Sequence, residues 1–332
     1  MPMKSKIIKI TISIFSLILL VTILFFGYLI LLLNSGRAIG SRVVIDKENS
    51  RLYVNDDEDI RILQMSDTQI CGLGDALKVF GAMKTTIEKA QPDLIILTGD
   101  NFMDGSKRLI IEEYVEFMDS FEIPWAPILG NHDYNIAISL DEMSDMFESA
   151  EYCLFKKGTV DESYGNYHYN IMRNGKLVYT LVFMDNAKGF RKEHLDWYLT
   201  TIEQITEYNA GIVVPSLTAF HIPIVETMYA YYDAYYDDGS IVGEKNEWIS
   251  YLRKDKGFFR IAKELGSVET IIYGHNHTNT FICDYRDVKL CYGIKTGRAS
   301  YNDKNIQGGR VYSLTNENTL RIDDISIAGI FL

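Results

Sequence analysis

Five short segments between residues 67 and 277 of this 332-residue chain carry side chains of the types that bind metal ions. They are Asp67-Thr68-Gln69, Gly99-Asp100-Asn101, Gly130-Asn131-His132-Asp133, the lone His221 and Gly274-His275-Asn276-His277. Carboxylate, carboxamide and imidazole donors without thiolate suit the hard or borderline divalent metals that serve in hydrolysis. Two such ions about 3.5–4 Å apart can activate a hydroxide and hold a phosphoryl group for in-line displacement. The segments therefore predict a two-metal hydrolytic site.

Apolar runs that are typical of buried strands precede the segments. Four of them lie at residues 62–65, 94–97, 212–214 and 270–273. The fifth, residues 124–129, contains two prolines, so we expect a poorer strand that lies near a sheet edge or starts late. In open α/β sheets the carboxyl ends of the strands converge on the ligand crevice. We therefore expect the five segments to meet at one place.

The ordered motifs D-x-[HQ], G-D-x, G-N-H-D, a lone histidine and G-H-x-H resemble the calcineurin-like metallophosphoesterase superfamily over about residues 58–316. Further details resemble its Dcr2/Size1-like, purple-acid-phosphatase-related branch, namely His221-Ile222-Pro223, Gly243-Glu244-Lys245 and Lys295-Thr296-Gly297-Arg298. The resemblance implies an α/β fold, a four-layer α/β/β/α sandwich of two mixed β-sheets, which also suits the expected alternation of strands and helices. It also implies two divalent metal ions, whether Mn, Fe, Zn or Ni.

The resemblance also implies a role for each motif residue. One metal would be held by Asp67, Gln69, Asp100 and His277, and the other by Asp100, Asn131, His221 and His275. His132 would be the general acid for the leaving oxygen, and Asp133 would orient its ring. We also expect Asn101 and Arg298 to contact the substrate.

Gln69 departs from the commonest family pattern, which has histidine at this position. A carboxamide oxygen is a neutral and weaker donor than imidazole, so we expect the first metal site to be looser or to select a harder metal. The alternative is that Gln69 is a loop residue that only hydrogen-bonds to the backbone.

Residues 7–33 contain Lys9 as their only charge and are long enough to cross a hydrocarbon core of about 30 Å at 1.5 Å per residue. Lysines at positions 4, 6 and 9 place the amino terminus in the cytoplasm by the positive-inside rule, although Arg37 and Arg42 weaken that bias. We expect a single-pass signal anchor in the cell membrane. A cleaved signal peptide is the alternative, but its apolar region is usually shorter.

This interpretation divides the chain into four parts. Residues 1–6 form a cytoplasmic tail, residues 7–33 the transmembrane anchor, residues 34–57 a linker with an entrance hairpin, and residues 58–332 the catalytic domain outside the cytoplasm. We expect hairpin strands at 42–47 and 51–54, and helices at 77–90, 109–121, 141–149, 192–208 and 258–265. A Tyr- and Asp-rich insertion at 227–238 would either recognise a substrate group or form an amphipathic surface helix.

The charge of the chain restricts its partners. The net charge is −12, and removal of the four basic residues of positions 1–37, which contain no acidic residue, leaves −16. Such a surface repels polyanions, so we expect a small phosphoester substrate and no long nucleic acid. Cys283 and Cys291 flank an expected turn and would either pair across the hairpin or pack as reduced thiols.

The sequence therefore favours a membrane-anchored phosphomonoesterase or phosphodiesterase that uses a metal-bridging hydroxide and His132. Two alternatives remain open. One is a metal-dependent nuclease or phosphodiesterase that acts on short nucleotides. The other is a non-catalytic binding module that contains the metals, which is disfavoured because His132 and Asp133 would have no role in it.

Overall fold

A computed structural model describes residues 14–25, 39–55, 57–237 and 239–329. Two mixed β-sheets form the centre of the domain. The smaller sheet has the strand order β13-β12-β3-β4-β5, and β4 pairs in parallel with both of its neighbours. Its strands are β3 (Ile60–Met65), β4 (Leu94–Thr98), β5 (Trp125–Ile128), β12 (Gly308–Leu314) and β13 (Leu320–Ser326).

The larger sheet has eight strands in the order β1-β2-β6-β7-β8-β9-β11-β10. It mixes antiparallel hairpins with the parallel pairs β2-β6, β7-β8, β8-β9 and β9-β11. Its strands are β1 (Val44–Asp46), β2 (Arg51–Val54), β6 (Tyr167–Arg173), β7 (Lys176–Phe183), β8 (Ser216–Ala219), β9 (Val268–Tyr273), β10 (Ile282–Tyr285) and β11 (Val288–Tyr292). The expected entrance hairpin is β1 with β2.

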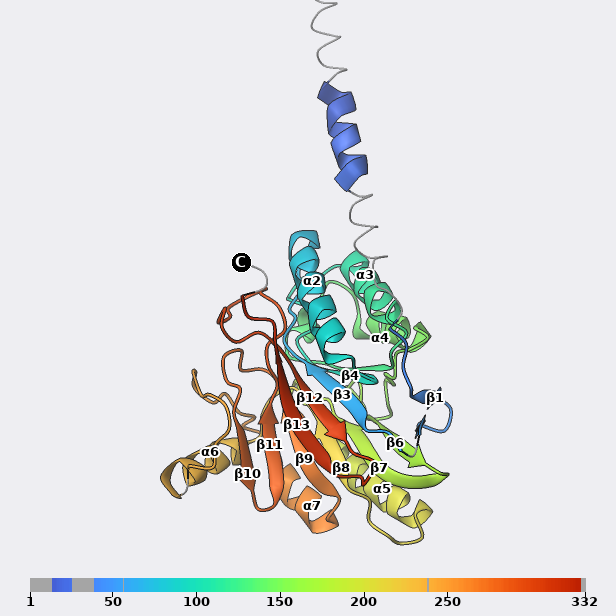
Figure 1. Cartoon of the computed structure of the whole chain (residues 1–332), viewed down its shortest axis with the longest axis vertical. Coiled ribbons are helices and arrows are strands. Elements are labelled where there is room, and N and C mark those ends of the chain that lie inside the picture. Colours follow the sequence, from blue (N-terminus) through green and yellow to red (C-terminus); the bar gives the residue numbers. More distant parts are fainter. Residues whose placement is uncertain (1–13, 26–38, 56, 238, 330–332) are drawn as a thin grey trace, which may run out of the picture.

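Helices cover the outer face of each sheet (Figure 1). The smaller sheet carries α2 (Leu73–Ala90), α3 (Arg108–Asp119) and α4 (Leu140–Ser149), and the larger sheet carries α5 (Lys192–Tyr208) and α7 (Phe258–Leu265). One buried cluster joins Ile62 and Ile95 of the smaller sheet to Leu181 of the larger sheet. A second cluster joins Val182, on the opposite face of β7, to α5 and α7. The predicted mixed α/β architecture with two mixed sheets is confirmed.

Two of the predicted strands, at residues 124–129 and 212–214, had different outcomes. The run at 124–129 is the edge strand β5, as expected, and Pro127 lies within it. The run at 212–214 is not a strand, because Ile212 is 66% exposed and the paired residues begin at Ser216. In β8, small polar residues alternate with apolar ones and all four residues are buried, so the strand has no run of valine and isoleucine like that at 212–214.

The insertion after His221 is the helix α6 (Val225–Asp237). Its buried side includes Ala230 and Ala234, whereas Tyr235 and Tyr236 are exposed, which is the pattern of an amphipathic surface helix. Figure 1 shows this helix beside β10, away from the helices of the smaller sheet.

The hairpin cysteines are free thiols. Cys283 lies opposite Leu290, and Cys291 lies opposite Ile282, so the two sulfur atoms point to opposite faces of the sheet. Cys291 belongs to the cluster between the sheets and Cys283 to the cluster under α5 and α7. Of the two alternatives that the sequence left open, the structure favours reduced packing.

The predicted tail at residues 1–6 lies outside the described residues, as does most of the predicted membrane span at 7–33. Residues 14–25 of that span are described and form a helix. Within the described part of the chain, no helix combines the length and the apolar character needed to cross a bilayer.

Candidate metal centre and active site

The five predicted segments meet at one edge of the domain, because each follows the carboxyl end of a strand. Three of these strands, β3, β4 and β5, belong to the smaller sheet, and two, β8 and β9, belong to the larger sheet. Backbone hydrogen bonds join the segments, from Asp67 N to Gly99 O (3.2 Å) and from Gly274 N to His221 O (3.0 Å). The site therefore lies across the boundary between the two sheets.

Three glycines of the motifs make this approach of the loops possible. A Cβ atom on Gly99 would lie 2.6 Å from Nδ1 of His221, and Gly99 also has a φ of +87°. A Cβ atom on Gly130 or Gly274 would overlap the carboxylate of Asp100 or of Asp67. Each glycine thus allows close contact between one loop and a candidate ligand of another loop.

The backbone is also unusual at the candidate ligands. Asp67, Gln69, Asp100 and His275 all have positive φ angles, between 49° and 73°. Non-glycine residues rarely adopt this left-handed conformation, and such residues cluster at functional sites because the surrounding structure holds them there. The carboxylates and imidazoles therefore have directions that the fold imposes.

Two histidines have their tautomers fixed by backbone carbonyls. Nδ1 of His221 lies 2.8 Å from Thr98 O, and Nδ1 of His277 lies 2.8 Å from Tyr301 O. A carbonyl oxygen only accepts hydrogen bonds, so in the neutral imidazole Nδ1 carries the proton and Nε2 has a lone pair. These lone pairs face carboxylate oxygens, at 3.3 Å from Asp100 Oδ2 for His221 and at 3.5 Å from Asp67 Oδ1 for His277. In this neutral form the facing acceptors repel each other, and a cation between them, either a proton on Nε2 or a metal ion, removes the repulsion.

The remaining candidate ligands extend these pairs into two groups. Nδ1 of His275 lies 3.3 Å from Nε2 of His221, and the buried Oδ1 of Asn131 has no hydrogen-bond partner in the described structure. Donor atoms lie within 4.8 Å of one another in two sets, Asp67-Asp100-His277 and Asp100-His221-His275. Asp100 belongs to both sets. These residues fit two divalent ions that share Asp100.

The pKa values reflect the same convergence of charge. Burial lowers the pKa of His221, but the Asp100 and Asp67 carboxylates outweigh burial and raise it to about 9. Burial and the neighbouring His221 lower the pKa of His275 to about 4. Burial raises the pKa of Asp100, and the charge of His221 more than reverses this effect. The buried carboxylates thus require a positive charge beside them, and a bound cation can supply it.

His132 has the position expected of a group that acts on the substrate. Its backbone N–H donates to Asp100 Oδ1 (2.9 Å), and its Nε2 lies 4.0 Å from Asp100 Oδ2. The ring lines a cavity of about 560 Å³ together with Gln69, His275 and His277. The imidazole is therefore next to the metal centre with one nitrogen facing the space where a substrate would bind.

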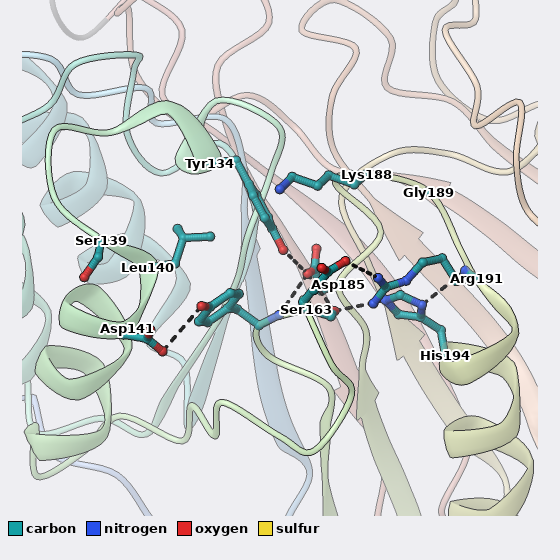
Figure 2. A pocket seen from close by; sticks show the side chains of 12 residues that line it. Tyr134, Ser139, Leu140, Asp141, Ser163, Asp185, Lys188, Gly189, Arg191 and His194 are labelled. Carbon is teal, nitrogen blue, oxygen red and sulfur yellow. Dashed lines mark hydrogen bonds and ion pairs between the residues drawn. The ribbon is translucent and has the colours of Figure 1, made fainter.

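Figure 2 shows a second cavity, of about 500 Å³, whose lining contains none of the predicted ligands. Its buried Asp185 accepts hydrogen bonds from Tyr134 Oη, from Ser163 Oγ (2.8 Å) and from the Tyr164 N–H (3.0 Å). The next residue, Asn186, accepts the backbone N–H of His221 (3.2 Å). Asn186 thus connects this region to the loop that carries His221.

Comparison with known proteins decides the family. A family model described as calcineurin-like phosphoesterase matches residues 60–279. The chain belongs to this family. It is 25% identical to the probable inactive purple acid phosphatase 28 of Arabidopsis thaliana over 305 residues, which cover 77% of this chain and 75% of the plant protein. It is also 25% identical to phosphatase DCR2 of Saccharomyces cerevisiae over 307 residues, covering 77% of this chain and 51% of the yeast protein.

Solved structures share the fold of this calcineurin-like phosphoesterase. A dimetal phosphatase from Danio rerio superposes with a TM-score of 0.50 and 12% identity, covering 81% of this chain and 98% of that chain. Plasmodium GAP50, described as the anchor in the inner membrane complex, also gives 0.50, with 15% identity and coverage of 82% and 87%. These structures show the fold alone, whereas the family model and the two curated relatives confirm the expected resemblance, including its Dcr2-like branch.

The prediction that Asp133 orients the His132 ring was wrong. Nδ1 of His132 lies 2.7 Å from Asp104 Oδ1, and the carboxylate of Asp133 points elsewhere. Asp133 accepts the backbone N–H groups of Gly130 (2.8 Å) and Phe102 (2.8 Å). Burial and the nearby Asp100 charge raise the pKa of Asp133 to about 7. Asp133 therefore joins the loops after β4 and β5, and Asp104 orients the ring.

The two predicted substrate contacts, of Asn101 and Arg298, stay predictions, and the structure gives both side chains protein partners. Asn101 is buried, with its Nδ2 bonded to Ile128 O (2.8 Å) and to Asp133 Oδ2 (3.2 Å), so its side chain supports the loops. Arg298 donates from Nε to Gln307 Oε1 (2.9 Å) and does not line the cavity at the metal centre. Neither residue lines the cavity at the metal centre.

The sequence did not reveal the rim of the active-site cavity. Glu247 and Trp248 line it from a loop without helix or strand, and Trp248 is 75% exposed. Glu247 accepts the Thr278 N–H (2.7 Å) and the Tyr301 hydroxyl (3.1 Å). The Tyr301 ring stacks on His277 at a centroid distance of 3.9 Å. The position of these residues relative to the histidine motif does not predict their role, because the contacts join loops that are far apart in the sequence.

Proposed function

We propose that this chain is a metal-dependent phosphoesterase that hydrolyses small phosphoesters. The observation that carries the proposal is the pair of fixed lone pairs, on His221 and His277, that face the Asp100 and Asp67 carboxylates. A divalent cation between the facing atoms would stabilise this arrangement, and it would compensate two carboxylates that lie this deep in the protein. The unpartnered Asn131 oxygen adds a further donor for the second ion.

Divalent ions bound by these side chains would polarise the phosphoryl group and activate a water molecule for attack. The chain itself positions the other participants. In the role of general acid, His132 would give a proton from Nε2 to the leaving oxygen, while Asp104 accepts from Nδ1 and keeps the ring in this orientation. Asp133 fixes the loop that carries Asn131 and His132 by accepting three backbone N–H groups, of Gly130, Asn101 and Phe102.

The names of the relatives include both a phosphatase and probable inactive phosphatases. We infer activity for this chain from its own residues, because a binding module that kept the metals for structure has no use for a partly exposed His132 beside them. An imidazole placed beside the metal centre but outside the ligand sets distinguishes the catalytic interpretation from the structural one.

We also propose that residues 7–33 anchor the enzyme in the cell membrane, with the catalytic domain outside the cytoplasm. The lysines at positions 4, 6 and 9 support this orientation. A net charge of −16 after residue 37 disfavours long nucleic acids as substrates, whereas a small phosphoester is held locally by the bound cations.

The direct test is hydrolysis by the purified protein of p-nitrophenyl phosphate and of its bis-ester, with manganese, zinc, iron or nickel added to metal-free enzyme. We expect turnover that depends on metal and distinguishes the monoester from the diester. Binding of two ions per chain without hydrolysis of either ester would instead support the metal-containing binding module.

A further inference from the structure

A buried lysine lies beside the one ligand position that departs from the family pattern. Lys295 follows β11, and its side chain is almost fully buried, with 1% of the residue exposed. Its Nζ donates to the backbone oxygen of Asp67 (2.6 Å) and to Oε1 of Gln69 (3.2 Å). Ser66 and Lys295 form an isolated parallel bridge, which fixes the backbone from which the ammonium reaches Gln69.

The two ends of the Gln69 carboxamide have different neighbours. Oε1 faces the Lys295 ammonium, and Nε2 donates to Asp100 Oδ2 (3.2 Å). A reversed amide would place two donors together at Lys295 and two acceptors together at Asp100. Both neighbours therefore favour the same orientation of the amide.

In this orientation the amide nitrogen of Gln69, and not its oxygen, faces the shared Asp100 carboxylate. An amide nitrogen with two hydrogens has no lone pair for a metal, and the oxygen that could coordinate is held by an ammonium group. The other candidate ligands of the first ion, Asp67, Asp100 and His277, keep donor atoms within 4.8 Å of one another.

We propose that Lys295 excludes Gln69 from the first metal site, so that Asp67, Asp100 and His277 are the three protein ligands of that ion. Gln69 is instead a hydrogen-bond donor to the shared Asp100 carboxylate. Lys295 is a positioning residue, because it acts on the metal centre through the amide of Gln69. This inference rests on the proposed two-metal site.

The test is a metal titration of the metal-free full-length chain in detergent with Mn²⁺, by calorimetry and by counting bound ions. The two interpretations of Gln69 predict different patterns in Gln69→Leu. A donor to the shared carboxylate affects both sites, so both dissociation constants should change by the same factor. Loss of a true ligand would weaken the first site alone, by about tenfold or more, and would refute the proposal.

The lysine is tested by Lys295→Met, which frees the amide to turn its oxygen toward the first ion. We expect the affinity of that site to rise by about tenfold relative to the second site, because loss of the Gln69 donor to Asp100 changes both sites by the same factor. The gain should disappear in the double variant with Gln69→Leu, which isolates the coupling between the two residues. An unchanged first site in a folded Lys295→Met protein would contradict the proposal.

The Gln69→Leu comparison decides the question even where Lys295→Met does not fold. A parent protein that binds no Mn²⁺ at either site would refute the proposed function itself. A parent that binds two ions, with only the first dependent on Gln69, would refute this inference and leave the proposed function intact.

Discussion

Replacing His132 by alanine tests the proposed chemistry separately from metal binding. The ring lines the cavity, with Nε2 4.0 Å from Asp100 Oδ2, and it belongs to neither of the two candidate ligand sets. Loss of a general acid lowers kcat by about 10²–10⁴, which corresponds to about 2.7–5.4 kcal/mol of activation free energy. We therefore expect His132→Ala to keep both metal ions and to lose most of its turnover.

Asp104→Asn should show a smaller effect of the same kind. The substitution keeps an oxygen near Nδ1 but removes the charge from a hydrogen bond of 2.7 Å. Charged hydrogen bonds exceed neutral ones by about 1–1.5 kcal/mol, and the 55% exposure of the Asp104 side chain reduces this to about 1 kcal/mol. The expected loss in kcat is about fivefold. Asn135→Ala is the matched control, because it removes the other side-chain partner of Asp104.

The assay compares kcat for an alkyl phosphate and for p-nitrophenyl phosphate, with bound metals counted in each variant. A good leaving group needs less protonation, so the loss in His132→Ala should be smaller for the p-nitrophenyl ester. Equal losses for the two esters would refute the general-acid assignment and leave His132 with a positioning role. Loss of a metal ion in His132→Ala would refute its place outside the ligand sets.

Three other predictions address the ligands, the packing and the anchor. Asp100→Asn removes the charge shared by both ligand sets, so metal counting should find one or both ions lost and hydrolysis abolished; two retained ions with normal turnover would contradict the assignment. Gly130→Ala places a methyl group against the Asp100 carboxylate and should destabilise the protein by about 1–3 kcal/mol in urea unfolding, whereas Gly74→Ala, in open space on α2, should not destabilise it. In intact cells, external protease should digest the domain after residue 33, and this domain should pellet with membranes until detergent is added; a soluble form that begins near Ala38 would indicate a cleaved signal peptide.

The architecture and the convergence of the motifs could be predicted from the sequence, because both depend on local patterns. Apolar runs followed by Asp100 or His275 mark strand ends, and strand ends converge in any sheet of this class. The sequence could not place Asp104, because its contact with His132 depends on how two loops fold over each other. Ile212 shows a second limit, since β-branched residues mark a strand only where the tertiary structure buries them.

The roles of adjacent residues were the hardest to assign. Asp133 follows His132 in the chain, so proximity in sequence favoured an interaction that the structure does not contain. The 3₁₀ turn at Asp133–Asn135 directs the carboxylate inward to backbone N–H groups and leaves the imidazole at the cavity. Lys295 was missed for a related reason, because no ligand motif contains lysine.

The location of the metal centre across both sheets has a mechanical consequence. Each ligand set combines at least one carboxylate after a strand of the smaller sheet with at least one histidine of the larger sheet, as in Asp67 with His277 and Asp100 with His221. Every coordinated ion would therefore cross-link the two halves of the sandwich, and sliding of one sheet over the other would break coordination bonds. Ion release and opening of the domain along this boundary would then be one coupled event, in which the rigidity of the fold depends on the occupancy of the catalytic centre.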